Sequence, residues 1–220
     1  MVRRLSFAIL ALLLCLSAAP GVPVGAAVAE RCFAETGLCV AGRFLEYWEA
    51  NGGLPQQGFP ITEVIEERSL FDGKIYRVQY FERARFEEHP ENQVPYDVLL
   101  GLLGVEQFEA KYGSGQPAAD GGFGAGAECA DFPETGKAVC GPFLAYWRAN
   151  GGLAQQGMPI SDLFTETNPT DGKRYLTQYF ERARFEYHPE NQEPHQVLLG
   201  LLGREQYQGA VSSLRRQGTN

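Results

Sequence analysis

The sequence lacks the short motifs that mark common catalytic centres. It contains no G-x-S-x-G, no phosphate-binding glycine loop and no H-E-x-x-H, and no cysteine in the setting of a nucleophile. Its three histidines are too few and too scattered to suggest a metal centre. We therefore expect no nucleophilic catalytic residues, no metal and no cofactor.

Basic clusters and long apolar runs are also scarce. The chain holds 19 basic and 27 acidic residues, a net charge of −8, and no basic run that would attract nucleic acid or anionic lipid. The apolar run from Leu5 to Ala19 is too short for a comfortable membrane span, and no later stretch qualifies. We expect neither a nucleic-acid partner nor a membrane span in the mature chain.

The N-terminus has the pattern of an export signal. Arg3 and Arg4 precede the apolar run, and Ala27-Val28-Ala29 is a small-x-small cleavage site. We predict a signal peptide at residues 1–29, whose removal leaves 17 basic and 27 acidic residues and a net charge of −10. General and twin-arginine export both stay open. The predicted location is secreted or attached to the cell envelope.

Four cysteines remain after the signal, and in an oxidising compartment they indicate two disulfides. Three pairings exist, and the spacing favours Cys32–Cys39 and Cys129–Cys140 because each pair brackets a Glu-Thr-Gly segment. A zinc site is the alternative, but these spacings fit no finger or ribbon pattern. Each small disulfide loop would stabilise its surroundings by about 2–3 kcal/mol in the chain-entropy model.

The chain contains an internal repeat. A shift of 99 residues aligns 33–108 with 132–207 without a gap, and about 49 of the 76 positions are identical. Modules of about 80 residues bury only modest cores, so disulfides or packing between modules would help them. We predict a first module at 30–110, a flexible Gly/Ala-rich linker at 111–128, a second module at 129–208 and a polar, frayed tail at 209–220.

Each module is predicted to be α+β, in the order helix, loop, β-hairpin, helix. Aromatic residues recur at helical spacing from Phe44 to Trp48, and Asn51-Gly52-Gly53 ends that helix. Asp72-Gly73 predicts a turn, and the residues from Tyr76 to Tyr80 alternate as a strand does.

The second helix of the module is predicted to start near Pro95, which suits a first helical turn. The apolar residues from Val98 to Phe108 would form its buried face. Gly101 and Gly104 within it would bend the helix or permit close approach of another backbone.

The two copies diverge unevenly. Between residues 62 and 71 only Glu67 matches its counterpart, Glu166, whereas between residues 79 and 93 only one position differs. A recent duplication alone would spread the changes more evenly. We infer that folding or function constrains the second segment.

The identical stretch QYFERARFE, at 79–87 and 178–186, predicts a tight β-hairpin. With a two-residue turn at Arg83-Ala84, Phe81 would face Phe86 across the strands on the core side. The weak point is Ala84, because tight hairpin turns prefer residues that tolerate positive φ.

The opposite face of this hairpin would be polar, with Glu82 paired to Arg85. It is either a solvated structural face or a surface that binds a carbohydrate or a peptide. The candidate ligand-binding residues are Tyr80, Glu82, Arg85, Glu87 and His89, with Tyr179, Glu181, Arg184, Glu186 and His188 in the second module.

Two further groups of residues suit recognition. Trp48 and Trp147 could stack on a sugar ring, although their place on a helix face favours a role in the core. Glycine-flanked loops present exposed amide side chains that could bind a ligand or form a plain polar loop: Gln56, Gln57, Gln155 and Gln156.

A catalytic interpretation pairs a carboxylate with an imidazole on one strand face. Glu87 would act with His89, and Glu186 with His188. General acid–base catalysis requires such groups at a defined distance in a cleft. A glycosidase-like carboxylate pair would be Glu82 with Glu87, but the adjacent arginines favour salt bridges instead.

These motifs resemble the repeat unit of the LGFP family over most of both modules. Gln57 and Gln156 replace the leucine before the family's G-x-P element, and Ala84 and Ala183 replace its hairpin glycine. The residues that carry the resemblance are Trp48, NGGLPQQGFPIT at 51–62, Asp72-Gly73, QYFERARF at 79–86, His89-Pro90, Val98 and Gly101.

The resemblance implies an exported bacterial module with a noncatalytic binding or anchoring role at the cell envelope. Family members with many repeats can close into a ring-like β assembly; for two modules, intramolecular pairing or self-association stays open. The leading hypothesis is a protein that binds a cell-wall polymer, such as a polysaccharide, or a surface protein. The alternatives are a secreted hydrolase and a purely structural surface protein.

Overall fold

The computed structural model of this chain describes residues 28–69, 72–113 and 115–217. Nearly all of the predicted signal peptide therefore lies outside the described residues. The described part forms six helices and twelve strands and contains two disulfides. A mixed α and β fold with two disulfides is thus confirmed.

The elements of the N-terminal half recur in the same order in the C-terminal half. The first half contains β1 (Glu30–Phe33), β2 (Leu38–Ala41), α1 (Gly42–Ala50), α2 (Gly53–Gln57), β3 (Ile65–Arg68), β4 (Ile75–Tyr80), β5 (Arg85–Glu88), β6 (Val98–Leu100) and α3 (Leu103–Tyr112). The second half contains β7 (Cys129–Phe132), β8 (Lys137–Cys140), α4 (Gly141–Ala149), α5 (Gly152–Gln155), β9 (Phe164–Thr167), β10 (Arg174–Tyr179), β11 (Arg184–Tyr187), β12 (Val197–Leu199) and α6 (Leu202–Gln217).

Each half has a four-stranded antiparallel sheet and a two-stranded ribbon. The sheets have the strand orders β3-β4-β5-β6 and β12-β11-β10-β9, and the ribbons are β1-β2 and β7-β8. The predicted plan of helix, loop, hairpin and helix therefore misses strands on both sides of the hairpin.

The ribbons carry the disulfides, which join the predicted partners. Cys32 lies directly opposite Cys39, and Cys129 opposite Cys140. The two disulfides lie at different positions of the repeat, because Cys129 and Cys140 correspond to Glu30 and Ala41 in the first ribbon. Glu30 lies within 4.8 Å of both sulfurs of the first disulfide, but sulfurs in a disulfide are not thiolate ligands for a metal.

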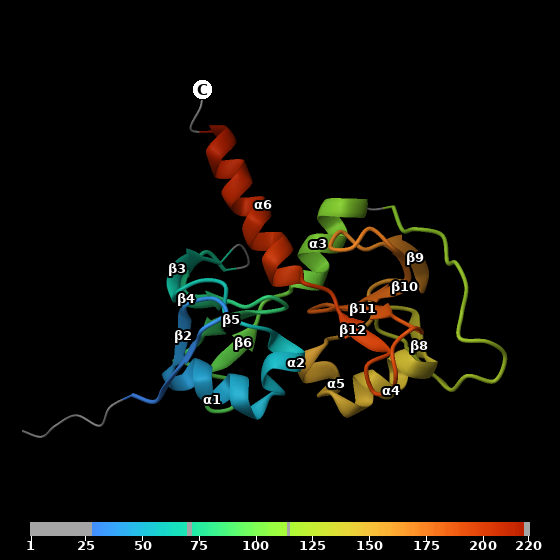
Figure 1. Ribbon diagram of the computed structural model, residues 1–220, viewed down its shortest axis with the longest axis horizontal. Helices are drawn as coiled ribbons and strands as arrows, with labels where there is room; N and C mark the ends of the chain where they lie inside the picture. The colour runs from blue at the N-terminus through green and yellow to red at the C-terminus, as the bar shows by residue number, and fades with distance from the viewer. Residues whose placement is uncertain (1–27, 70–71, 114, 218–220) are drawn as a thin grey trace, which may run out of the picture.

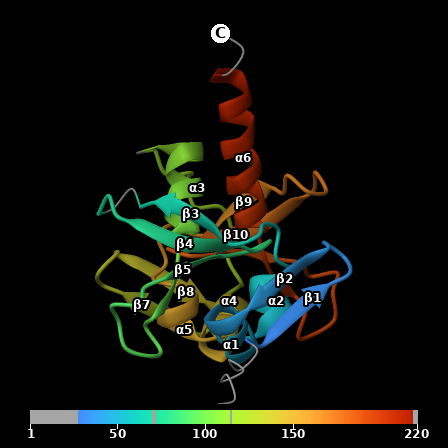
Figure 2. The same cartoon turned by 90° about the vertical axis from the view of Figure 1, so that its left-hand side faces the viewer.

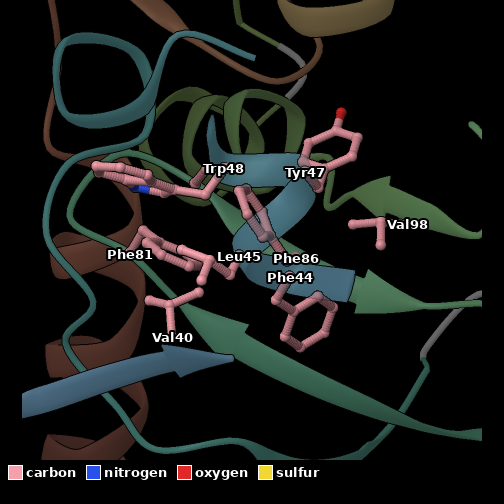
Figure 3. Packing of buried hydrophobic residues seen from close by; sticks show 9 residues of the cluster. Val40, Phe44, Leu45, Tyr47, Trp48, Phe81, Phe86 and Val98 are labelled. Atoms are coloured by element: carbon pink, nitrogen blue, oxygen red, sulfur yellow. The ribbon is translucent and has the colours of Figure 1, made fainter. Parts of the chain in front are cut away.

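A layer of aromatic side chains joins α1 to the inner face of the first sheet (Figure 3). Tyr47 packs edge-on against Phe86 with 5.0 Å between ring centroids. Trp48 is buried and its Nε1 donates to the Gly58 carbonyl oxygen at 3.1 Å, which confirms its core role. Burying each such ring stabilises the fold by about 1.5–3 kcal/mol.

The predicted second helix starts later than expected. Val98–Leu100 is strand β6, which pairs with β5 through Phe86 and Leu100, and α3 begins only at Leu103. The prediction failed because a short apolar run fits a buried strand and a helix equally well.

The last helix of each half covers the sheet of the other half. Figure 1 shows α6 rising beside the first sheet and α3 beside β9 and β10, and Figure 2 shows both on the opposite side of the sheets from α1, α2 and α4. Tyr207 of α6 packs 5.5 Å from Tyr80, and Phe108 of α3 packs 5.1 Å from Tyr179. Each sheet is therefore buried on its outer face by a distant part of the chain.

Two glycines allow these helices to start against the hairpin of the other half. A Cβ atom on Gly104 would lie 1.8 Å from the Phe180 carbonyl oxygen, and one on Gly203 would lie 2.0 Å from that of Phe81. The Arg204 amide donates to the Glu82 carbonyl oxygen at 3.1 Å. The predicted use of Gly104 for close backbone approach is confirmed.

The predicted linker and tail are more ordered than their composition suggested. Phe123 packs 5.1 Å from Phe143, and the Asp120 amide donates to the Leu163 carbonyl oxygen at 3.0 Å. The predicted frayed tail is wrong in part, because α6 continues to Gln217. Across the ranges that the structure describes, no helix combines the length and apolarity required to cross a bilayer.

Candidate functional site

The repeated hairpin turns one residue earlier than predicted. The Phe81 amide donates to the Ala84 carbonyl oxygen at 2.8 Å, so Glu82 and Arg83 form the turn. Every described residue with positive φ is a glycine, so this turn does not need the left-handed conformation that we expected at Ala84. The predicted cross-strand pairs Phe81–Phe86 and Glu82–Arg85 are therefore wrong.

The displacement nevertheless preserves the two faces of the hairpin. Tyr80 pairs with Arg85 and Gln79 with Phe86, a shift of two residues from the predicted pairing. A shift by an even number leaves each strand side chain on its face. Phe81 and Phe86 accordingly both lie in the core, with their ring centroids 4.2 Å apart.

The polar face is buried rather than solvated. Tyr80, Arg85, Glu87 and His89 share it as predicted, and α6 lies over it, whereas Glu82 leaves it for the turn. Tyr80 is 4% exposed, and Arg184 in the second half is 2% exposed. The prediction of a solvated surface failed because the covering helix comes from the other half of the chain.

Arg85 is the centre of an ionic cluster in the first half. Its Nη2 lies 2.5 Å from Glu87 Oε1, and its Nη1 lies 3.9 Å from Glu67 and 3.7 Å from Glu106. The Tyr80 hydroxyl donates to Glu67, with both carboxylate oxygens at 3.1 Å. Burial raises the pKa of Tyr80 to about 12, although Arg85 partly offsets it. Burial also raises the pKa of Glu106, again against the effect of Arg85.

The second half repeats this cluster around Arg184 and closes it more tightly. Arg184 donates to Glu186 at 2.8 Å and binds both oxygens of Glu205, at 3.0 and 2.9 Å. Burial opposes the charge of Arg184, but its bonds to Glu205 and the neighbouring charges outweigh burial and raise its pKa.

Helix α3 adds two groups to the second cluster. The Lys111 ammonium contacts Glu166, and the Tyr112 hydroxyl donates to the same oxygen at 2.5 Å. Burial and this carboxylate raise the pKa of Tyr112. The Tyr179 hydroxyl also donates to Glu166, at 3.1 Å. Glu166 therefore binds one ammonium and two hydroxyl groups.

The geometry favours structural ion pairing over the catalytic interpretation. His89 Nε2 lies 3.5 Å from Glu87 Oε2, and His188 Nε2 lies 3.4 Å from Glu186 Oε2. The other oxygen of each glutamate is bound by the arginine of its own strand. The glutamate side chains are only 14% and 5% exposed, which leaves little access for a substrate.

The glutamine loops are not the exposed loops that we predicted. Gln57 and Gln156 are each 2% exposed and lie between the two halves. Gln156 Nε2 donates to Gln56 Oε1 at 2.9 Å, and Gln57 Nε2 donates to Gln155 Oε1 at 3.0 Å. The sequence could not show this contact, because each loop is covered by its own copy in the other half.

The same glutamines reach helices across the interface. Gln56 donates to the Tyr146 hydroxyl at 2.7 Å and to Asn150 at 2.8 Å. Gln155 donates reciprocally to the Tyr47 hydroxyl at 2.9 Å and to Asn51 at 2.8 Å. These paired contacts make the interface nearly two-fold symmetric.

The turn glutamates differ between the halves. Glu82 Oε1 binds Arg204 of α6 at 2.5 Å. Glu181 accepts a hydrogen bond from the Met158 amide at 3.0 Å, but the counterpart of Arg204 is Val105. The Glu82 side chain therefore links the two halves, whereas the Glu181 side chain bonds within its own half and only its backbone carbonyl, which accepts from the Val105 amide at 3.2 Å, reaches the other half.

A groove of about 820 Å³ lies between α2, α4 and the segment that leads into β12. Its walls are largely apolar, with Leu54 and Pro55 on one side and Pro142 and Ala145 on the other. Polar groups converge on it from Tyr146, Asn150, Arg83, Glu193 and His195. This size and this mixture of surfaces are typical of ligand sites in proteins.

The pseudosymmetric counterpart of this groove carries charged side chains. Arg43 binds Asp97 there, at 2.5 and 2.8 Å, and Glu46 at 2.7 Å. The corresponding residues in the groove are Pro142, Gln196 and Ala145, which are smaller or uncharged. Three substitutions thus replace an ionic cluster by an open, apolar wall.

Several residues of these sites were not predicted. Glu67 and Glu166 had a visible signal, because they are the single match in a divergent segment. The groove had none, because its walls come from both halves. The unpredicted residues are Glu67, Glu166, Glu106, Glu205, Lys111, Tyr112, Leu54, Pro142, Ala145 and Tyr146.

A scan against protein-family models gives no match for this chain, and searches of curated proteins and of solved structures give none.

Proposed function

We propose that this chain is an exported, noncatalytic protein of two duplicated modules that binds a cell-envelope polymer or a surface protein. The observation that carries this proposal is the groove between α2 and α4. The repeat, the N-terminal signal pattern and the resemblance to the LGFP family are consistent with it.

The chemistry of the groove suits a ligand with both apolar and hydroxylated surfaces. Phe59 and Tyr146 offer aromatic rings, and aromatic rings stack well on the apolar faces of sugars and side chains. Asn150, Gln196 and His195 offer hydrogen-bonding groups beside them. Ligand binding was one of two interpretations of the hairpin face, and we now assign it to the groove instead.

The proposal is tested by sedimentation of the mature protein with purified envelope fractions. The decisive variant, Pro142→Arg/Ala145→Glu/Gln196→Asp, replaces three groove residues by those at the equivalent positions in the first half of the chain. We expect this variant to keep its circular dichroism spectrum and to lose sedimentation with the envelope, because charged side chains would fill the groove.

Matched leucines supply a milder comparison. Leu54 lines the groove, whereas Leu153 is its exposed counterpart in the other half. Leu54→Ala should weaken binding and Leu153→Ala should not. Wild-type protein that stays in the supernatant with every fraction would exclude envelope binding. Equal binding by the groove-filled variant would exclude the groove.

A further inference from the structure

The groove between α2 and α4 is bordered by an edge of a β-sheet. Strand β12 is the last strand of the second sheet and pairs with β11. All three residues of β12, from Val197 to Leu199, line the groove. An edge strand presents backbone donors and acceptors that no neighbouring strand of its own sheet uses. The groove therefore lies where a further strand can be added to this sheet.

The register shows which backbone groups of β12 point away from β11. The Gly200 amide donates to the Arg184 carbonyl oxygen at 2.9 Å, which makes these two residues a hydrogen-bonded pair. Such pairs recur at every second residue of an antiparallel ladder, so Leu198 also turns its amide and carbonyl toward β11. The amides and carbonyls of Val197 and Leu199 therefore point outward, away from their own sheet.

An arginine without a close counterion lines the same groove. Arg83 Nη1 lies 3.7 Å from Glu82, which binds Arg204 through its other oxygen. The Nε of Arg83 is buried and has no hydrogen-bond partner in the described part of the chain. Arg43, whose side chain is about as exposed, lies 2.5 Å from Asp97. Because buried polar groups are normally paired, a carboxylate is the group that Arg83 lacks.

Tyr146 adds a second donor beside this guanidinium. Its hydroxyl accepts a hydrogen bond from Gln56 at 2.7 Å, and none of the described residues accepts its own proton. Burial raises the pKa of Tyr146, whereas the hydrogen bond from Gln56 and the charge of Arg83 oppose the rise, so the two side chains are neighbours. A guanidinium and a hydroxyl proton together suit a carboxylate, which only accepts.

The equivalent edge in the first half has no such groove beside it. Asp97, the residue before β6, binds Arg43 there at 2.5 and 2.8 Å. In the groove the same two positions hold Gln196 and Pro142. The chain thus provides its own control, a matching strand edge beside a filled surface.

We propose that the groove binds an extended peptide segment of a surface protein, which adds to the edge of β12 and places a carboxylate at Arg83. This inference rests on the proposed function and specifies the chemistry of its ligand. The peptide backbone would bond to the outward amides and carbonyls of Val197 and Leu199, and its side chains would contact the apolar walls. A saccharide has no row of alternating amides and carbonyls to match this edge.

The test is an NMR titration of the ¹⁵N-labelled mature protein with the blocked peptide acetyl-Thr-Val-Glu-Val-Thr-amide. We expect saturable shifts in the millimolar range, and slower hydrogen exchange, at the amides of Val197 and Leu199. The equivalent amides of Val98 and Leu100 should not change.

Two control peptides separate the two kinds of contact. One has glutamine in place of glutamate, and the other has N-methyl groups on its three central amides. Each should bind about tenfold more weakly or worse, because it lacks either the charged hydrogen bond or the backbone donors. Maltotriose is the saccharide control and should not slow exchange at β12.

Three variants test the arginine. Arg83→Met should remove the preference for the glutamate peptide over the glutamine peptide, a ratio measured within one folded protein. Arg182→Met is the matched control, because Arg182 is the counterpart of Arg83 and does not line the groove. Glu193→Gln removes an acid that lines the groove, so it should keep or strengthen binding of the glutamate peptide.

The outcomes also separate this inference from the proposed function. No saturable shift with the glutamate peptide, equal binding of all three peptides, or slower exchange at Val197 and Leu199 with maltotriose would overturn the inference. Envelope sedimentation of wild-type protein without peptide shifts would refute the inference alone. Peptide shifts in a protein that sediments with no fraction would refute envelope binding alone.

Discussion

Substitution of Gly203 by alanine tests the exchange of helices between the two halves. The new Cβ would lie 2.0 Å from the Phe81 carbonyl oxygen and 2.9 Å from that of Ala84. Real Cβ atoms do not approach a carbonyl oxygen closer than about 3 Å, so α6 must move by roughly 1 Å or the hairpin must deform. Either movement weakens the contacts made by the next residue, Arg204.

The cost can be worked from those contacts. Overpacking of a rigid site costs about 1–3 kcal/mol, and loss of the backbone bond from Arg204 to Glu82 costs about 1 kcal/mol. The partly exposed Arg204–Glu82 ion pair adds at most about 1 kcal/mol. Alanine has a higher helix propensity than glycine, which offsets up to about 1 kcal/mol of this loss. The free energy of unfolding should fall by about 2–4 kcal/mol.

Urea unfolding of the disulfide-bonded protein, followed by circular dichroism, measures this change from the transition midpoint and its slope. Gly209→Ala in the same helix is the control, because nothing lies within 4 Å of the added Cβ; it should stabilise the protein by up to about 1 kcal/mol. A Gly203→Ala midpoint equal to or above that of wild type would refute the helix exchange. Gly104→Ala, the equivalent substitution in α3, should lower the free energy of unfolding by a similar amount.

The remaining predictions concern the ionic clusters and the disulfides. Arg184→Met should lower the free energy of unfolding by about 3–5 kcal/mol, because it leaves the buried Glu186 and the partly buried Glu205 without their counterion. Arg85→Met should cost less, about 1–3 kcal/mol, because its surroundings are more exposed. Urea midpoints for both variants decide this, and equal losses would contradict it. The hydrogen bonds from Arg43 lower the pKa of Asp97 below 3.8, so the stability that this pair adds is complete above that pH and is lost as the pH falls through the folded-state pKa. Asp97→Asn should therefore flatten the loss of stability in acid, and an unchanged acid slope in urea titrations would refute this. Intact-mass analysis after alkylation should find four reactive thiols only after reduction, and any thiol in the oxidised protein would contradict the two disulfides.

Local features of the fold could be predicted because short-range chemistry decides them. Asn51 ends α1, glycine with φ of +73° lies at the Asp72-Gly73 turn, and the disulfides join cysteines that flank short turns. The segment at Val98–Leu100 failed because its identity as a strand depends on pairing with β5, not on its own composition. Local signals do not specify such pairings.

The candidate site was predictable only as far as one strand face. Side chains alternate between the two faces of a β-strand, and this alternation correctly placed Tyr80, Arg85, Glu87 and His89 together although the assumed turn was wrong. The covering helix, the contact of Lys111 with Glu166 and the groove depend on contacts between residues about 55 to 140 positions apart in the chain. Nothing in the local sequence distinguishes a face covered in this way from one open to water.

The exchange of helices explains why the two copies diverge unevenly. The segment at 79–93 contributes one face to its own core and the other to the helix of the opposite half, so a change there disturbs both halves at once. Outside this segment the copies differ more often, as at Lys111 against Ala210 and at Arg43 of α1 against Pro142 of α4. The difference at Arg43 and Pro142 also coincides with the groove. A duplicated, self-covering fold can therefore keep its shared frame while each half acquires its own surface.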